Sequence, residues 1–330
     1  MYLRRKHRFP FGRGGTNKTP DLTPMAGQCG LTLAKQLVFV DGNDSNAGTT
    51  ANYGTKNKPF STIESACDYI YNNYQADLKI DDVDTAIIVA PGHTESLTAA
   101  SQIVMRSNGT VLIGIGTGTR RPTITSDAAV SGFQISANNL WIENIVFKAS
   151  VATVTTGIAI DANRGNMVIT KCEFIVDTAG TDEFIDCINL ADNNNNVHIE
   201  DCKFDMQEGN DGAVTAIMLD ADCDNVHIEN CIIQGTYSFA CILGDTTKSE
   251  ELHIDNCLLQ NGATDAINTE PLVELMTGTS GLLTDCYMMA NVLVTTSLVG
   301  DTMVAYNNVY SETVGPGVGL ATASGTTLTA

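Results

Sequence analysis

Hydrophobic and polar residues alternate over short stretches of this chain, and one stretch of ten residues occurs three times with little change. NNVHIEDCKF at Asn195–Phe204 returns as DNVHIENCII at Asp224–Ile233 and as EELHIDNCLL at Glu250–Leu259. Three further stretches, LWIENIVF, MVITKCEF and GLLTDCYM, keep the same apolar positions. One apolar position is common to all copies and recurs every 26 to 30 residues, at Ile142, Ile169, Ile199, Ile228, Ile254 and Leu283. Alternation of period two with many β-branched residues predicts short strands, because a helix would repeat every 3.6 residues.

The repeat also predicts how these strands are arranged. Between the copies lies a second apolar alternation, such as Ile188 and Leu190, and polar turns rich in Asn and Asp connect the two. Short strands with such corners at this period predict an all-β solenoid, in which each coil stacks in parallel on the one before. The Leu-x-x-Leu-x-Leu frame of leucine-rich repeats is missing, and propeller blades need about 40 residues.

Each copy predicts the direction of its side chains. Val197 and Ile199 should point into the coil, and His198 and Glu200 should point out of it. A bend at Asp201 and its equivalents is expected, since Asn and Asp tolerate the left-handed conformation. Stacking then forms ladders of like residues about 4.8 Å apart. The inner ladder consists of Cys172, Cys202, Cys231, Cys257 and Cys286, which we expect to be buried free thiols.

A helix is predicted near the start of the solenoid. Ser61 and Glu64 have the spacing of a capping box. The residues that follow form one apolar helical stripe, at Ile63, Ala66, Cys67, Ile70 and Tyr74. Such a helix would cover the open edge of the first coil.

Charge is distributed unevenly along the chain. Six Lys and Arg residues precede the first acid, Asp21, and the remaining 12 basic and 38 acidic residues give a charge of −26. We expect this acidic body to repel nucleic acid and anionic membranes, and the basic arm to seek an acidic surface. No apolar run is long enough to span a membrane, and no apolar segment of a secretory signal follows the basic start. The predicted organisation is a basic extended arm (1–36), a cap with the first coils (37–105), β-helix coils (106–310) and a C-terminal tail or cap (311–330).

The opening of the solenoid resembles a known family. VFVDGNDSNAGTT, KPFSTIESACDYI, AIIVAPGHTESL and VLIGIGTGTRRPTI follow one another in order between Val38 and Ile124. Together they resemble the start of pectate-lyase-like right-handed parallel β-helices, found in polysaccharide lyases and in phage spikes and fibres. The resemblance covers roughly residues 38–310, and it implies fold more strongly than activity.

This resemblance implies a virion component, because phage β-helices of this type are usually homotrimeric spikes, fibres or head decorations. The first expectation is a non-enzymatic capsid decoration or head fibre on the particle surface. The arm would contact an acidic capsid surface or a neighbouring virion protein through Arg4, Arg5, Lys6, Arg8, Phe9, Phe11, Arg13 and Lys18. One alternative is a tailspike that cleaves host surface polysaccharide as a hydrolase or lyase. Another is a cellular polysaccharide lyase.

Two outward rows are the candidate chemical site. The weak catalytic candidates are His198, Glu200, His227, Glu229, His253 and Asp255. We interpret them as structural ladders, in which His beside carboxylate relieves stacked like charges. A divalent metal held by the imidazoles and a pair of catalytic carboxylates are the alternative hypotheses. Of the Asn-Thr-Asp, Asp-Asp and Arg-Ile-Lys elements of polygalacturonase-like enzymes, the first and third do not occur and Asp-Asp occurs once, at Asp81 and Asp82, while Trp141 is the sole tryptophan. We therefore predict no cofactor, no metal and no catalytic residue.

Overall fold

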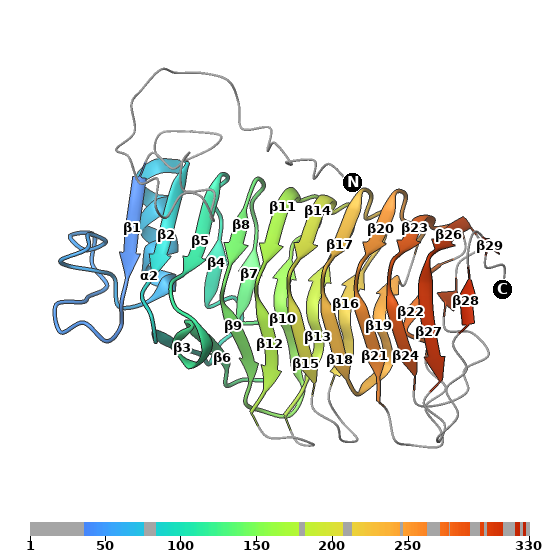
Figure 1. Ribbon diagram of the computed structural model, residues 1–330. Helices are drawn as coiled ribbons and strands as arrows, with labels where there is room; N and C mark the ends of the chain where they lie inside the picture. Colours follow the sequence, from blue (N-terminus) through green and yellow to red (C-terminus); the bar gives the residue numbers. More distant parts are fainter. Residues whose placement is uncertain are drawn as a thin grey trace, which may run out of the picture.

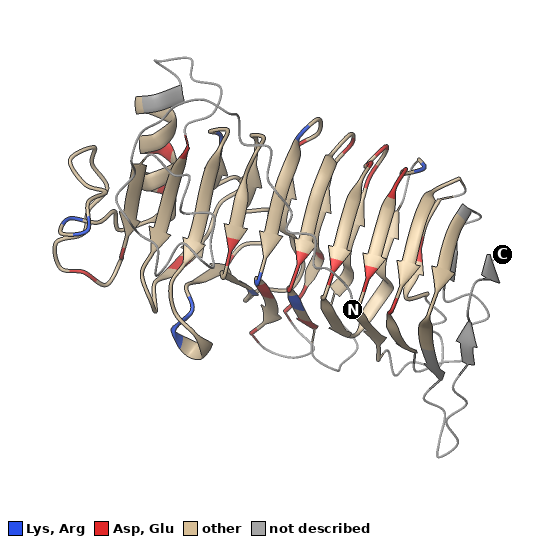
Figure 2. Cartoon of the chain, turned by 45° about the horizontal axis from the view of Figure 1, so that its top comes forward, with Lys and Arg blue, Asp and Glu red and all other residues tan. Residues whose placement is uncertain are grey.

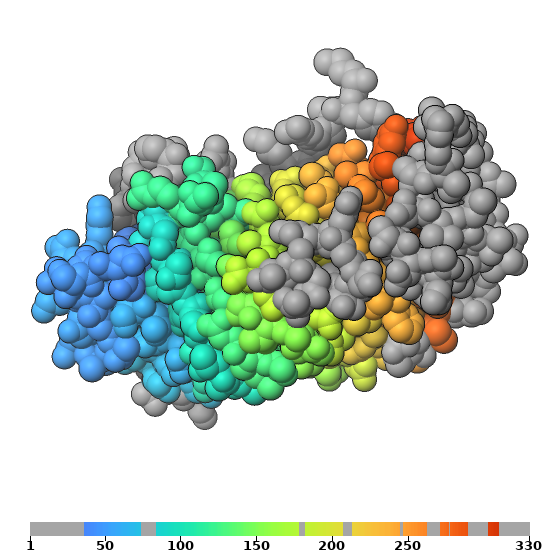
Figure 3. All heavy atoms as spheres, turned by 90° about the horizontal axis from the view of Figure 1, so that it is seen from below, coloured from blue at the N-terminus to red at the C-terminus, as the bar shows by residue number. Residues whose placement is uncertain are grey.

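The protein is a right-handed parallel β-helix built from three long sheets (Figure 1). The computed structural model describes residues 36–75, 84–177, 182–206, 213–244, 247–262, 271–276, 278–290, 298–299, 302–312, 321–323 and 326–327. In the space-filling view, the coils follow one another as bands of colour along the molecule (Figure 3). The predicted fold class is confirmed. The described residues contain no helix long and apolar enough to cross a membrane.

Sheet 1 has eleven strands, in spatial order β1 (Gln36–Val40), β2 (Thr85–Val89), β5 (Thr110–Gly114), β8 (Trp141–Glu143), β11 (Gly165–Thr170), β14 (Asn195–Glu200), β17 (Val226–Glu229), β20 (Leu252–Asp255), β23 (Ser280–Thr284), β26 (Thr302–Tyr306) and β29 (Thr326–Thr327).

Sheet 2 has ten strands, in order β3 (Thr94–Leu97), β6 (Thr123–Ser126), β9 (Val146–Ala149), β12 (Glu173–Val176), β15 (Lys203–Met206), β18 (Ile232–Gly235), β21 (Leu258–Asn261), β24 (Tyr287–Ala290), β27 (Asn308–Glu312) and β28 (Ala321–Ala323).

Sheet 3 has eight strands, in order β4 (Ile103–Met105), β7 (Phe133–Ile135), β10 (Val154–Ile160), β13 (Phe184–Leu190), β16 (Ala213–Leu219), β19 (Tyr237–Gly244), β22 (Val273–Glu274) and β25 (Leu298–Val299). The paired strands are parallel, except that β28 and β29 run antiparallel to β27 and β26. A 3-10 turn, η3 (Gly118–Arg120), links β5 to β6.

Like residues stack in register from coil to coil, as the repeat predicted. Ile199 pairs with Ile228, and Ile228 with Ile254, and all three are fully buried. Phe147, Phe174 and Phe204 stack with ring centroids 5.1 and 4.8 Å apart. The expected bend after each sheet 1 strand is also confirmed, with φ between +51° and +62° at Asn144, Lys171, Asp201, Asn230, Asn256 and Asp285. Lys171 adopts this conformation although it lacks the short polar side chain that favours it.

The cysteine ladder lies directly after these bends, inside the coils. Its five residues are at most 2% exposed, and no disulfide joins them. The thiols of Cys202, Cys231 and Cys257 each donate to a backbone carbonyl of the preceding coil, with Sγ–O distances of 3.5 Å. Cysteine thus fills a tight corner and supplies a weak donor.

The helix at the start of the solenoid is α2 (Ile63–Ile70), followed by one π-helical turn, η2 (Tyr71–Gln75). Four of its residues join the interior, namely Ile63, Ala66, Cys67 and Ile70. The predicted capping box is wrong. The N-cap is Thr62, whose Oγ1 accepts from the Ser65 N–H at 3.1 Å.

The remaining N-terminal donors of α2 bind a carboxylate from another strand. Glu95 of β3 accepts the N–H of Ile63 at 2.6 Å and that of Glu64 at 3.3 Å. His93 is fully buried beside it, with Nε2 3.3 Å from Glu95 Oε2, while its Nδ1 accepts from the Gly42 N–H at 3.0 Å. A negative charge at a helix N-terminus is favourable, so this buried pair fastens the cap helix to the first coils.

The ladder thiols should react slowly with thiol reagents in the native protein. The five ladder thiols are at most 2% exposed, so a reagent has little access to them in the native protein. Burial raises the pKa of the Cys202 thiol, whereas its hydrogen bond with Cys231 lowers the pKa of Cys231 to about 5, so the slow reaction follows from burial and not from the pKa. Mass spectrometry after timed alkylation should find the five ladder cysteines modified only on denaturation. Fast native labelling of all five would contradict their inward placement.

Glu95→Gln should lower the free energy of unfolding by about 1.5–3 kcal/mol, because a buried charged acceptor of two backbone N–H groups is replaced by a neutral one. Urea unfolding followed by circular dichroism measures the change. Glu64→Gln is the matched control. Burial, Asp68 and Glu95 raise the pKa of Glu64, so neutralising Glu64 should cost nothing. Equal stability of the Glu95 variant and the wild type would show that the pair does not anchor the helix.

Candidate functional site

The candidate site lies on the outer face of sheet 1, defined as the side chains of that sheet that point away from the interior. Two columns of residues form this face. The first column, from β1 to β26, is Leu37, Ala86, Val111, Trp141, Val168, His198, His227, His253, Leu282 and Val304. The second column is Phe39, Ile88, Ile113, Glu143, Thr170, Glu200, Glu229, Asp255, Thr284 and Tyr306. Acidic residues recur at one level of neighbouring strands (Figure 2).

The three histidines predicted from the repeat come together as one stack in the middle of the first column. The rings of His198 and His227 are 4.6 Å apart between centroids and 9° from parallel, and those of His227 and His253 are 4.6 Å apart and 8° from parallel. Val168 on one side and Leu282 on the other interrupt the row.

The second column places a carboxylate beside each histidine. His227 lies between two partners, with Nε2 2.9 Å from Asn225 Oδ1 and Nδ1 3.6 Å from Glu229 Oε1. Asp255 accepts from the Thr284 hydroxyl at 2.6 Å. Burial, and then the neighbouring His227, lower the pKa of His253. The stack thus disfavours simultaneous charge on adjacent imidazoles, while the carboxylates compensate for the charge that does form.

The stacked geometry suits neither a metal centre nor a convergent catalytic group. Zinc needs ligand atoms about 2.0–2.1 Å from one point, whereas parallel rings one coil apart face the same way and the outer two are separated by the middle one. Within the described ranges, no cluster of three or more His, Cys, Asp or Glu has a geometry that could hold a metal ion. The proposal that the rows are structural ladders fits this arrangement best.

Five cations of the coils form ion pairs, which bears on lyase-type catalysis by a free Arg or Lys, whereas Arg164 is in none of the described pairs and its buried Nε has no hydrogen-bond partner. Lys171 Nζ lies 2.7 Å from Glu143 Oε1, and Arg121 Nη1 lies 2.7 Å from Glu173 Oε2. Lys203 bridges Glu173 and Asp205. Lys148 binds Asp177, and Lys248 binds Glu250. These groups offset part of the negative charge of the coils.

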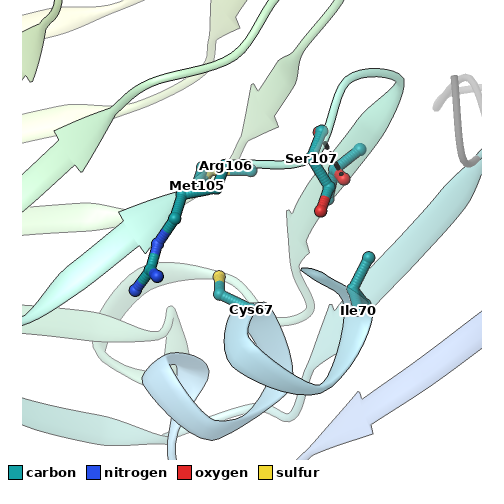
Figure 4. A pocket seen from close by; sticks show the side chains of 6 residues that line it. Cys67, Ile70, Met105, Arg106 and Ser107 are labelled. Carbon is teal, nitrogen blue, oxygen red and sulfur yellow. Dashed lines mark hydrogen bonds between the residues drawn. The ribbon is translucent and has the colours of Figure 1, made fainter. Parts of the chain in front are cut away.

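One small hollow lies beside the cap helix, away from the histidine stack. Cys67 and Ile70 of α2 meet Met105, Arg106, Ser107 and Thr110 around an empty volume of about 150 Å³ that includes open solvent (Figure 4). Arg106 binds Asp68 of α2 at 3.1 Å and lies 5.3 Å from the centre of the Tyr71 ring. The hollow is a seam between cap and coil and lacks the paired carboxylates of a sugar-cleaving site.

Sequence reasoning missed His93 and Glu95, and the arm residues predicted to bind a partner lie outside the described part of the chain. The signal for the missed pair was the alternation in β3. Since Leu97 points inward, Glu95 and His93 must point inward too. Two ionisable groups at inward positions indicate a buried polar link, here the one that holds the cap helix.

Comparisons with known proteins give structural likenesses alone. No protein-family model and no curated protein match the chain. A pectin methylesterase from Aspergillus niger is 15% identical over 85% of this chain and 86% of its own, with a TM-score of 0.49. The pectate lyase Pel9A is 12% identical over 86% and 78%, with a TM-score of 0.45. An Acinetobacter phage tailspike protein is 12% identical over 78% and 56%, with a TM-score of 0.37. At these values the likenesses carry no argument about activity, which depends on this chain's own side chains.

Replacing His198, His227 and His253 together by Ala should leave the coils folded and any release of reducing ends from polysaccharide unchanged. The rings are partly exposed cross-strand pairs, each worth less than about 1 kcal/mol. Circular dichroism, urea unfolding and a reducing-end assay test this. Ile228→Ala, at a fully buried position of the same strand as His227, should cost about 2–5 kcal/mol and shows that the stability assay responds. Loss of a measured activity in the triple variant would favour the enzyme hypothesis.

Proposed function

We propose that the protein is a non-enzymatic structural component of a phage virion, a capsid decoration or head-fibre β-helix held by its N-terminal arm. The observation that carries the proposal is the separation of charge, with six basic residues in the first 18 and a charge of −26 on the rest. A long acidic rod repels acidic surfaces, whereas a short basic arm binds them. The arm supplies the contact, and the β-helix projects from it.

The candidate contacts combine charge with two apolar side chains. They are Arg4, Arg5, Lys6, Arg8, Phe9, Phe11, Arg13 and Lys18. Arginine forms bidentate bonds with carboxylates, and an aromatic ring adds apolar area at a binding surface. The surface that the arm would bind is an acidic patch of the capsid or of a neighbouring virion protein. The assembled form would be a homotrimer on the particle.

The side chains of sheet 1 support a structural role for the β-helix. Its histidines stack on one another, and elsewhere on the coils ion pairs occupy Lys148, Lys171, Lys203 and Lys248. The second candidate is a tailspike that cleaves host polysaccharide. The observation that favours it is the row of Glu200, Glu229 and Asp255 in register on the outer face, because glycoside hydrolysis uses paired carboxylates.

Electron microscopy of particles that carry a labelled copy separates the two candidates. Label over the whole head supports a decoration, and label confined to the tail supports a tailspike. Label on neither would contradict both.

Removing residues 1–20 should leave the β-helix folded and abolish its binding to particles. If the charges of the arm contribute to binding, the intact protein should bind particles more weakly as the salt concentration rises, because exposed charges are screened beyond about 8 Å at physiological ionic strength. Co-sedimentation with particles at increasing salt measures both effects.

A full-length matched pair controls for truncation. Changing Arg4, Arg5, Arg8 and Arg13 to Lys keeps the charge and should preserve most binding, while changing the same residues to Gln should remove most of it. Full particle occupancy by the Gln variant would refute the role of the arm.

A further inference from the structure

A buried histidine joins three separate segments at the N-terminal end of the β-helix. His93, directly before β3, is fully buried, accepts from the Gly42 N–H at Nδ1 (3.0 Å), and has Nε2 3.3 Å from Glu95 Oε2. Glu95 in turn accepts the N–H groups of Ile63 and Glu64 at the start of α2. We call these contacts the latch, because they connect β3, the cap helix and the loop that follows β1.

The loop that Gly42 belongs to covers the outer edge of the first strand. Residues 41–60, which we call the strap, turn back along β1 at the blue end of the molecule (Figure 1). Phe39 of β1 donates to the Gly54 carbonyl at 2.9 Å and accepts from the Phe60 N–H at 2.8 Å. These bonds occupy backbone groups of an edge strand, which would otherwise be open to pairing with another chain.

The strap reaches the latch at a position that needs glycine. A Cβ on Gly42 would lie 2.9 Å from the Ser61 carbonyl oxygen and 3.3 Å from two atoms of the His93 ring. Both neighbours would have to move to admit it, so the backbone approaches the imidazole this closely because residue 42 has no side chain. The bond between strap and histidine is thus built into the local sequence.

The latch needs a neutral imidazole. Nδ1 of His93 accepts a hydrogen bond, so it carries no proton, and the proton on Nε2 faces the Glu95 carboxylate. An imidazolium has N–H groups at both nitrogens, so a second proton would set Nδ1–H against the Gly42 N–H. It would also place a charge on a fully buried ring, beside a carboxylate that already serves two backbone donors.

We propose that the latch is acid-sensitive and releases the strap and the cap helix from the first coils when His93 takes up a proton. In the open form His93 meets water, where histidine titrates at about pH 6.5. In the closed form a second ring proton breaks the bond to Gly42. The open form therefore binds more protons, so the closed form loses stability as the pH falls. This device is independent of the proposed virion role.

The ionisable groups of α2 do not explain a loss of the closed form on mild acidification. Burial, Asp68 and Glu95 raise the pKa of Glu64. The closed form then binds a proton at Glu64 more readily than the open form, so this residue favours closure as the pH falls. Burial raises the pKa of the Cys67 thiol, which stays neutral throughout. A loss of closure on acidification therefore points to the latch.

Charged groups on the other elements around the latch have contacts of their own. Asp41 of the strap accepts a backbone N–H at 3.0 Å, and Arg106, which follows β4, lies 3.1 Å from Asp68. Arg120 of η3 is exposed, and its carbonyl accepts the N–H of the residue before His93. Aspartate and arginine ordinarily keep their charge on mild acidification, which leaves His93 as the group whose charge changes.

Hydrogen exchange of the full-length protein tests the proposal, read as protection factors so that the intrinsic pH dependence of exchange is removed. Between about pH 7.5 and about pH 5, uptake of one proton by the open form should lower the protection of the strap and α2 about 30-fold. Peptides from β8 to β12 contain no histidine. They are the internal control and should keep their protection.

His93→Gln separates the latch from other effects of acid. Its amide can donate to Glu95 and accept from Gly42 but takes up no proton in this range, so the fall in protection should largely disappear. His198→Gln, in the stack on sheet 1, is the matched control and should keep the wild-type fall. A fall that persists in His93→Gln would overturn the proposal. Protection of the strap and α2 that stays constant or rises on acidification would overturn it too.

A measurement on the wild-type protein covers the case in which His93→Gln fails to fold. Long-range proton–nitrogen correlation spectra of its five histidines should show at least one ring held as the Nε2–H tautomer at about pH 7.5. That ring should become doubly protonated over the pH range in which the strap and α2 lose protection. Absence of such a ring, or its double protonation without loss of protection, would contradict an acid-sensitive latch.

Discussion

Parallel hydrogen bonding between coils in fixed register is the interaction on which the rest of this structure depends. A one-residue slip would turn every side chain to the opposite face, so each coil must return to sheet 1 at the same phase. The bends between sheets 1 and 2 meet this requirement by a left-handed residue at one position per coil, from Asn144 to Asp285. Lys171 shows that the position imposes the conformation even on a residue that disfavours it.

The register places like residues next to one another on adjacent coils. This stacking is favourable in the interior, but on the outer face it brings like charges together. Inside, Phe rings stack and thiols donate to the preceding coil. Outside, the same rule places imidazole over imidazole and carboxylate over carboxylate. The histidine column lies beside the carboxylate column, and ion pairs such as Lys171 to Glu143 add positive charge. Both arrangements reduce the repulsion between like charges on adjacent coils. A row of identical ionisable residues therefore follows from the fold and does not by itself indicate a reaction centre.

The sequence predicted what is periodic and missed what occurs once. The strands, the bends and the inward thiols each recur in several copies, so an accidental match in one copy does not change the prediction. The capping box at Ser61 and Glu64 was a single local match, and the acceptor that the helix uses is Glu95, 32 residues away from Ile63. Local spacing carries no information about such a partner. The partner residues of the arm stay a prediction.

The bonding of each ladder thiol to the coil directly before it has a consequence for how such a molecule changes in evolution. Cys202 contacts the carbonyl of Ile169, and Cys231 that of Ile199, so a coil makes the same contacts whatever its number in the series. Stability in such an array is approximately a sum of unit and nearest-neighbour contributions. Duplication of one whole coil would then lengthen the rod by about one strand spacing, roughly 4.8 Å, and loss of one coil would shorten it by the same amount. Every other contact would stay in place. The number of coils thus sets the length of the central β-helix, which can change by one coil at a time while its two ends stay unchanged.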